Sequence, residues 1–495
     1  MREAVVYNRN PRQDEKSFED IPLNARSLPN HRSNTRRPAM RSGQGPVPGS
    51  GSAPPPMKPA PFSRRRFLRD ATLASALAFP FVQRLPVLGA NGRLNIAGIG
   101  VGGKGWTDIT QCDGENIVAL CDVDDRRAAP AYQRFPAARR FKDFRRMLDE
   151  MDRQIDAVTV STPDHMHFLP AMWAIQRGKH VYCQKPLTHT VQEARLLTAA
   201  AARRKVATQM GTQGRSHPNV RRDAELIRSG AVGTVREVHC WTDRPGRWWG
   251  QGLQRPVETP AIPEGLDWDL WLGGAPARPY HSAYVPFAWR GFWDFGTGAL
   301  GDMGCHLLNV PDLALEIRDA TRVEARSEGL TAESGPVWAR VIWEIPARGK
   351  RAAFRLFWYD GTQKPDSALF AGHPLGDNGC LVIGSLDTML TSYEGGGVFK
   401  SGRAYADFKD VPETFPKNTA WEHSHYQEWI TAAKGGPKTL SGFEATGPMT
   451  EVVLLGNVAL RAGEPIEWNS RSMKVTNHKP ANRFVSHRYR HDWHA

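Results

Sequence analysis

Two separate stretches of this sequence carry residues that can exchange a proton with a hydroxyl group. Asp302 and His306 are four residues apart, so on a helix they lie on one face. A carboxylate can fix the tautomer of a neighbouring imidazole, and an imidazole can accept a hydroxyl proton near neutral pH. Lys185 follows a strand-like run and precedes a proline, where an ammonium group can hydrogen-bond a reacting oxygen. The simpler alternatives are that Asp302 and His306 form a surface pair and that Lys185 is a solvated loop lysine. Metal binding by Asp302 and His306 is a lesser alternative, because no third ligand is evident.

A glycine-rich turn predicts a site for a dinucleotide. Gly98, Gly100 and Gly103 have the spacing G-x-G-x-x-G, which begins at the end of the strand-like run 94–99 and leads into helix-compatible sequence. In such a turn, backbone amides approach a pyrophosphate that a side chain would exclude. A glycine-rich surface turn is the alternative.

The next strand-like run ends in an acid that indicates which dinucleotide binds. Asp122 lies 24 residues after Gly98, about where an acidic residue binds the ribose hydroxyls. A carboxylate there would repel a 2′-phosphate, so the sequence favours NAD over NADP. Arg126 and Arg127 lie close by and leave NADP open.

A third motif lies at the predicted carboxyl edge of the same sheet. Thr162, Pro163 and His167 follow the strand-like run 157–161, at the edge where open α/β sheets bind their ligands. We expect these residues to contact the cofactor. The alternative, which the sequence supports equally, is that His167 caps the next helix.

The pattern of runs along the chain predicts two domains. Residues 91–215 alternate short β-branched runs with helical stretches, which is typical of an α/β Rossmann domain with a parallel sheet. Residues 216–475 contain alternating apolar and polar runs, which predict an α+β domain with a mostly antiparallel open sheet; residues 476–495 form a tail. Strands are expected at 94–99, 117–121, 157–161, 180–183, 207–211, 235–242, 322–327, 337–345, 352–358 and 380–383. Helices are expected at 143–151, 168–176, 219–229, 300–316, 424–434 and 447–461.

The N-terminal part has the pattern of an export signal. Arg64 and Arg65 form a twin-arginine pair ahead of the apolar run 71–82, and the twin-arginine machinery exports folded proteins. We therefore expect a signal peptide at 57–90 and a periplasmic protein. The run is too short to span a bilayer, so no stable membrane insertion is expected after cleavage. Residues 1–56 are rich in Pro, Gly, Ser and Arg and predict a disordered segment or a mistaken extension before the true start.

Composition narrows the function classes. The formal charge is +14, but residues 1–90 hold 15 Lys or Arg against 6 Asp or Glu. The remainder has no basic stripe and no helix-turn-helix pattern, so we expect no nucleic-acid partner. The six cysteines are scattered without a CxxC pair, which favours buried free thiols over a zinc site or a disulfide framework.

The motifs together resemble those of the Gfo/Idh/MocA oxidoreductases, a family that includes glucose-fructose oxidoreductase and inositol 2-dehydrogenase. The resemblance covers residues 91–475. It implies that Lys185 and the Asp302/His306 pair converge on a substrate hydroxyl, with His306 as acid/base and Lys185 also near the cofactor. It also implies a homodimer or homotetramer formed through the open face of the second sheet. Gln184 departs from the glutamate that usually precedes Lys-Pro in this family.

The sequence thus predicts an NAD(P)-dependent oxidoreductase that removes hydride from a secondary hydroxyl of a sugar, cyclitol or glycoside. The periplasm has no evident dinucleotide supply, so we expect a tightly bound cofactor that is recycled in place. Sixteen tryptophans suit a carbohydrate site, because the CH face of a pyranose packs on an aromatic ring. The alternatives are an NAD-dependent glycosidase or lyase that acts through a transient keto-sugar, and a non-catalytic sugar-binding protein.

Overall fold

The N-terminal half of the computed structural model is built on a parallel sheet. The structure describes residues 92–494, so the predicted extension and the export signal lie outside the described residues. The strands are β1 (Asn95–Ile99), β2 (Asn116–Cys121), β3 (Arg139–Phe141), β4 (Ala157–Val160), β5 (His180–Gln184) and β6 (Thr208–Gly211). Their order is β3-β2-β1-β4-β5-β6 and every pair is parallel. This strand order is that of the Rossmann fold, as predicted. β3 was not predicted, because two of its three residues are exposed arginines.

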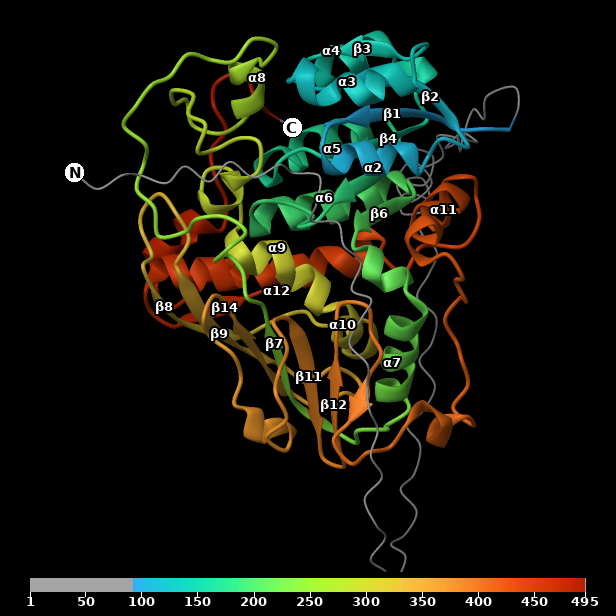
Figure 1. Cartoon of the computed structure of the whole chain (residues 1–495), viewed down its shortest axis with the longest axis vertical. Coiled ribbons are helices and arrows are strands. Elements are labelled where there is room, and N and C mark those ends of the chain that lie inside the picture. Colours follow the sequence, from blue (N-terminus) through green and yellow to red (C-terminus); the bar gives the residue numbers. More distant parts are fainter. Residues whose placement is uncertain (1–91, 495) are drawn as a thin grey trace, which may run out of the picture. The chain divides into compact units, whose positions relative to one another are not determined.

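Helices cover both faces of this sheet, because successive strand residues point to opposite sides. Ala97 and Val158 face α4 (Phe144–Glu150), α5 (Phe168–Gln176) and α6 (Val191–Arg204), whereas Ile96 and Leu120 face α2 (Lys104–Thr110) and α3 (Asp125–Arg134). A helix from near the end of the chain also covers the second face. Tyr426 and Trp429 of α11 (Trp421–Ala433) are buried there, and Figure 1 shows α11 beside β6.

The second sheet is mostly antiparallel, as predicted. Its nine strands have the order β13-β12-β11-β7-β10-β9-β8-β14-β15, and only β7 and β10 pair in parallel. They are β7 (Val235–Trp241), β8 (Arg322–Glu328), β9 (Trp338–Ile345), β10 (Phe354–Tyr359), β11 (Gly379–Gly384), β12 (Thr388–Thr391), β13 (Val398–Phe399), β14 (Ile466–Asn469) and β15 (Lys474–Val475). The four that were not predicted, β12 to β15, are two to four residues long.

Helices of both domains lie between the two sheets. α9 (Gly298–Leu307) and α12 (Phe443–Ala462) pack on β7, β8 and β9, and α12 also packs on α6 and β6 of the first sheet (Figure 1). The helix expected at 300–316 is in fact two helices, α9 and α10 (Asn309–Leu315), with Leu308 between them. The remaining α-helices are α7 (Pro218–Arg228) and α8 (Trp268–Leu272). Short 3-10 helices lie at Asp152–Gln154, Asp164–Met166, Gln213–Ser216, Ala288–Gly291, Ser367–Phe370, Tyr405–Phe408 and Lys479–Phe484.

The C-terminal tail, described to residue 494, packs back on the first domain through Tyr489 and Trp493. The Trp493 ring lies 6.1 Å from that of Phe144 in α4, and Tyr489 stacks on Phe168 of α5 at 6.3 Å. All six cysteines are buried and none forms a disulfide, as predicted. Among residues 92–494, no helix is both long and apolar enough to cross a membrane.

Candidate functional site

The structure brings Lys185 and Asp302 together at the carboxyl edge of the parallel sheet. Lys185 stands just after β5, and Asp302 is in the second turn of α9. The Lys185 Nζ donates to the Asp302 Oδ1 at 2.7 Å and to the Asp302 carbonyl oxygen at 2.9 Å. The side chains are 14% and 6% exposed. The strand end and the helix, 117 residues apart, therefore form one site.

Two arginines complete the surroundings of Asp302, and motif reasoning missed both. Arg244 forms an ion pair with the Asp302 Oδ2, and the Arg290 Nε lies 3.4 Å from the Asp302 Oδ1. Burial alone would raise the pKa of Asp302, but the charges of Lys185, Arg244 and Arg290 outweigh it and hold this pKa well below its usual range. Asp302 is thus a fixed anion shared by three cations.

Aromatic rings hold both guanidinium groups in place. The Arg244 guanidinium lies 4.2 Å from the ring centroid of Trp248. That of Arg290 lies 4.1 Å from Phe287 and 4.3 Å from Trp289. Stacking on an aromatic face leaves the edge of a planar guanidinium free to donate hydrogen bonds. Both arginine side chains are 21% exposed, so they remain accessible.

His306 lies one helical turn after Asp302, but the expected contact between the two is absent. Among the described residues, no hydrogen bond joins His306 to Asp302, whose oxygens all face cations, and the His306 Nδ1 is buried without a partner. Its ring meets that of Tyr393 edge-on at 4.8 Å. Burial first, and then the charges of Lys185 and Arg244, hold its pKa well below the usual value. The imidazole is therefore neutral near pH 7 and has a free nitrogen lone pair.

Gln184, which departs from the family pattern, is matched by a buried acid. The Gln184 Nε2 donates to the Asp108 Oδ2 at 2.8 Å. Asp108, on α2, is fully buried and also accepts from the Ser161 hydroxyl at 2.6 Å and from the Tyr426 hydroxyl at 2.6 Å. Lys104, one turn earlier, lies 3.6 Å from it. An amide is required at 184, because a carboxylate there would face a second carboxylate.

The glycine-rich turn has the tight geometry that the sequence predicts. Gly100 has φ +74°, and a Cβ there would lie 2.9 Å from the backbone of Ser161, so glycine is needed for strands β1 and β4 to end this close together. Gly98 lies within β1, and Gly103 caps α2 at φ +58°. The closest approach belongs to Gly105, where a Cβ would be 1.8 Å from the Gly100 carbonyl oxygen. Gly105 therefore seats α2 on the turn, a role that the motif assigns to its third glycine.

Asp122 holds the turn rather than extending away from it. Its Oδ2 accepts from the backbone amides of Val101 at 2.8 Å and Gly102 at 3.0 Å. Burial raises its pKa, although these backbone bonds oppose the shift. The site fits a dinucleotide: no side chain caps the N-terminus of α2, and only the guanidinium tip of Arg127 lies near the space that a side chain at Gly103 would fill.

His167 connects two loops of the site and is turned away from its open side. Its Nδ1 lies 2.7 Å from the Pro186 carbonyl oxygen, and its Nε2 lies 2.8 Å from the Thr162 carbonyl oxygen. The ring is 1% exposed. Thr162 donates its hydroxyl to the Met166 carbonyl, and Pro163 precedes the short helix at 164–166. The motif therefore positions the Lys185 turn, and its direct contact with a cofactor stays a prediction.

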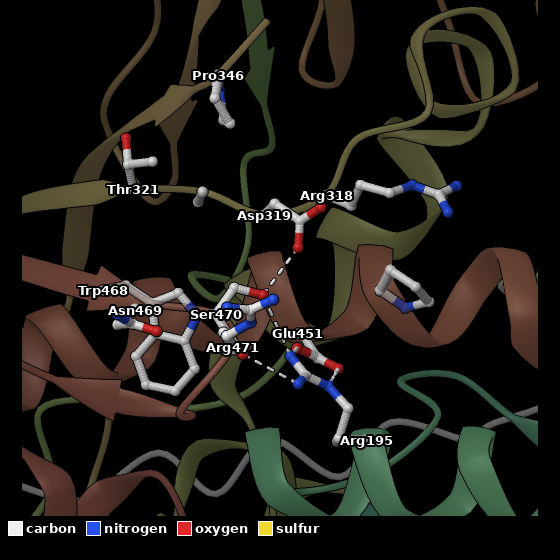
Figure 2. A pocket seen from close by; sticks show the side chains of 12 residues that line it. Arg195, Arg318, Asp319, Thr321, Pro346, Glu451, Trp468, Asn469, Ser470 and Arg471 are labelled. Atoms are coloured by element: carbon white, nitrogen blue, oxygen red, sulfur yellow. Dashed lines mark hydrogen bonds and ion pairs between the residues drawn. The ribbon is translucent and has the colours of Figure 1, made fainter. Parts of the chain in front are cut away.

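A large hollow lies elsewhere on the molecule. It measures about 620 Å³, between α6, α12 and the loop before β8 (Figure 2). Arg195 pairs there with Glu451 at 2.5 Å, and Ser470 donates to Asp319 at 2.8 Å. None of the predicted site residues lines it, and its charged groups are largely paired. Within residues 92–494, no cluster of three or more His, Cys, Asp or Glu is placed to bind a metal ion.

Comparison with known proteins agrees with this geometry. Residues 93–212 match the family model described as oxidoreductase family, NAD-binding Rossmann fold, and residues 218–345 match the family's C-terminal alpha/beta domain. The chain belongs to the Gfo/Idh/MocA oxidoreductase family. The predicted family and fold class are thereby confirmed, and NAD binding by the Rossmann domain is the family's shared property.

Individual Gfo/Idh/MocA relatives match over part of their length. D-apiose dehydrogenase of Paraburkholderia graminis is 36% identical over 129 residues, which are 26% of this chain and 33% of the relative. Glycosyl hydrolase family 109 protein 2 of Akkermansia muciniphila is 26% identical over 185 residues, 33% of this chain and 38% of the relative. The sequence matches thus span about a third of each relative.

Solved structures of the family extend the likeness of the fold. A levoglucosan dehydrogenase in complex with NADH and L-sorbose superposes with a TM-score of 0.52 at 16% identity, covering 76% of this chain and 98% of that one.

Four residues of the site were not predicted from the sequence, because they belong to none of its motifs: Arg244, Arg290, Asp108 and Tyr393. Arg244 lies in the segment 241–249, which holds three of the sixteen tryptophans and is therefore a weak signal of a carbohydrate site.

Proposed function

We propose that this protein is an NAD(P)-dependent oxidoreductase that removes hydride from a secondary hydroxyl of a sugar, cyclitol or glycoside. The observation that supports it most is the ion pair of Lys185 with Asp302, one helical turn before His306, at the carboxyl edge of a Rossmann sheet that also carries a glycine-rich turn. The names of the relatives, which include sugar dehydrogenases, agree with this substrate class.

The chain's own residues account for the proton side of the reaction. Asp302 holds the Lys185 ammonium in place, and that ammonium donates a hydrogen bond to the substrate oxygen as negative charge develops on it. His306, which burial and the nearby cations keep neutral, accepts the hydroxyl proton. Asp122 and the Gly98–Gly103 turn would hold a dinucleotide, with NAD favoured over NADP, and its nicotinamide would supply the hydride acceptor.

A cofactor that stays bound distinguishes this proposal from an ordinary soluble dehydrogenase. We propose that the protein acts in the periplasm and recycles NAD in place. The test is mass spectrometry of the small molecules released when the purified protein is denatured, followed by addition of a sugar panel while the absorbance of reduced nicotinamide is recorded. Release of no dinucleotide, with no binding of added NAD or NADP, would overturn the proposal in favour of a non-catalytic sugar-binding protein.

A second candidate is a glycosidase or lyase that acts through a transient keto-sugar. Oxidising a ring hydroxyl acidifies the neighbouring C–H bond, which permits elimination of a glycosidic group before the ketone is reduced again. The similarity to a glycosyl hydrolase family 109 protein favours keeping it. Product analysis separates the two: the oxidoreductase gives a keto-sugar or a polyol, and the glycosidase gives a cleaved glycoside.

Export is part of the proposal and has its own test. The twin-arginine machinery reads an arginine pair, so replacing both Arg64 and Arg65 with Lys should leave a folded precursor in the cytoplasm. Cell fractionation measures this directly, with Arg69→Lys as the matched control in the same segment. Continued periplasmic delivery of the double variant would show that another route exports the protein.

A further inference from the structure

Positive charge exceeds negative charge around the proposed reaction site. Lys185, Arg244 and Arg290 share the single carboxylate of Asp302. Two other acids lie nearby. Asp164 is buried and accepts from the Thr297 hydroxyl at 2.6 Å and amide at 3.1 Å. Burial raises the pKa of Asp164, although the charges of Arg290 and Lys185 oppose the shift. Asp243 pairs with Arg247 at 3.1 Å. Even with Asp164 ionised, three cations face two carboxylates, so at least one positive charge has no counter-charge from the protein.

The two arginines also keep donors free for a ligand. Arg244 reaches Asp302 through one nitrogen, Nη1, and Arg290 uses Nε toward Asp302 and Nη1 toward the Phe287 carbonyl at 3.1 Å. Among the described residues, neither Nη2 has a hydrogen-bond acceptor. Each guanidinium is fixed by stacking, and each arginine side chain is 21% exposed. Arg244 therefore keeps its Nε–Nη2 edge free, which is the geometry that binds an anionic oxygen pair, and Arg290 adds the free donors of its Nη2.

From this charge balance we infer that the substrate is a sugar that carries an anionic group, with a carboxylate, as in a uronic acid, the best match to the planar forks. Arg244 and Arg290 bind the anionic group, while the hydroxyl to be oxidised lies between Lys185 and His306. The inference rests on the proposed function, since it names the substrate class of the same site. An anion there would also offset the cations that lower the pKa of His306, so binding the correct substrate makes His306 a better proton acceptor.

The experiment compares sugars that differ only in charge. The full mature protein is assayed with glucose and glucuronate, and with galactose and galacturonate; glucose 6-sulfate and glucose 6-phosphate separate carboxylate from the other anions. Variants Arg244→Gln and Arg290→Gln each remove one cation. Arg247→Gln is the matched control, because Arg247 is on the same loop and pairs with Asp243. Binding is followed in parallel by tryptophan fluorescence, since Trp248 and Trp289 lie against the two arginines.

The expected result is a kcat/KM for the acidic sugars at least ~10-fold above that of their neutral partners. Each of the two glutamine variants should lower this preference by about 10- to 100-fold, mainly through KM, which is the usual loss for one charge-assisted hydrogen bond. The Arg247→Gln preference should equal that of the wild type, and the KM for acidic sugars should rise with salt.

Equal kcat/KM for charged and neutral sugars would overturn the inference while leaving the oxidoreductase proposal intact. The same holds if both arginine variants lose activity on all sugars alike, because that would mean a purely structural role. If no sugar reduces the cofactor, the proposed function fails, and the fluorescence titration still decides the inference: glucuronate without effect, or no tighter than glucose, contradicts it.

Discussion

His306 is the residue on which the proposed chemistry depends most. Its neutral ring suits it to accept a hydroxyl proton, so His306→Ala should slow hydride transfer by about 10²–10⁴-fold, the usual contribution of a general base, while dinucleotide binding is retained. Single-turnover reduction of the bound cofactor measures the rate. His423→Ala removes an exposed histidine of α11 and is the matched control.

Asp302 and Lys185 should respond differently from His306. Lys185→Ala removes the donor to the developing alkoxide and should slow the reaction on every sugar. Asp302→Asn leaves the shape but unpairs three cations, so it should also cost folding stability. A near-normal single-turnover rate in His306→Ala would contradict its role and leave Lys185 as the acid/base candidate.

Gln184 and Asp108 form a pair whose chemistry can be tested by exchange. Gln184→Glu would place a second carboxylate 2.8 Å from the buried Asp108, and we expect a loss of about 3 kcal/mol in the free energy of unfolding, the scale for an uncompensated buried charge. The loss should be largest at alkaline pH. It should lessen as the pH falls, because crowding raises the pKa of such a pair and one carboxyl becomes protonated.

The double variant Gln184→Glu/Asp108→Asn exchanges the amide and the carboxylate between the two positions. Because one amide again faces one carboxylate, this double variant should recover most of the lost free energy of unfolding, measured with denaturant. The single variant Asp108→Asn is the control for the loss of the Ser161 and Tyr426 contacts. Wild-type stability of Gln184→Glu at alkaline pH would show that the pair is not in contact.

At the scale of elements, the sequence predicts where strands and helices occur better than it predicts which distant elements contact one another. Gly100 and the run before it predict the first strand, the turn and α2, because the φ of the turn demands glycine. Nothing in the local pattern of α11 says that Tyr426 reaches Asp108 across the first domain. Arg244 and Arg290 could not be predicted for the same reason, because their contacts with Asp302 depend on how loops of the second domain fold over the edge of the first sheet.

The C-terminal tail provides an element-scale prediction. His487 Nε2 lies 2.9 Å from the buried Glu193 Oε1 at the start of α6, and Tyr489 donates to the same oxygen. Burial opposes the charge on Glu193, but His487 outweighs it and the pKa falls to about 2. Burial likewise opposes the charge on His487, and Glu193 raises the His487 pKa above its usual value. The pair therefore fastens the tail to the first domain.

The sign of the pH dependence follows from these shifts. A carboxyl with a lowered pKa stabilises the fold above the unfolded value near 4.5, and a histidine with a raised pKa does so below its unfolded value near 6.5. His487→Ala should thus cost most between about pH 4.5 and pH 6.5, roughly 3 kcal/mol, with less effect at pH 9. Thermal unfolding midpoints across pH measure it. His491→Ala, in the exposed part of the tail, is the control, and a cost independent of pH would contradict the ion pair.

At the scale of the whole molecule, no α-helix of residues 92–494 covers one face of the second sheet around β9 and β10, whereas the short 3-10 helix Ser367–Phe370 packs on Trp241 and Leu381 farther along that face. α9 and α12 cover one side, and Ile342 of β9 and Phe357 of β10 are opposite each other on the other side, both half-buried. Charged residues such as Arg340 and Arg355 flank them. An apolar centre with a polar rim is the usual anatomy of a protein interface, and a flat sheet can pair with a copy of itself about a two-fold axis.

We therefore expect a homodimer or homotetramer that forms through this face. Ile342→Glu should shift the molar mass measured by light scattering toward that of one chain, because two copies of the new carboxylate would meet near the axis without a partner. Phe357→Glu provides a second variant, and circular dichroism checks that each is folded. Val257→Glu adds the same charge at a residue that is 89% exposed in a loop and should keep the wild-type mass. If folded Ile342→Glu and Phe357→Glu also keep that mass, the chains associate through a different surface.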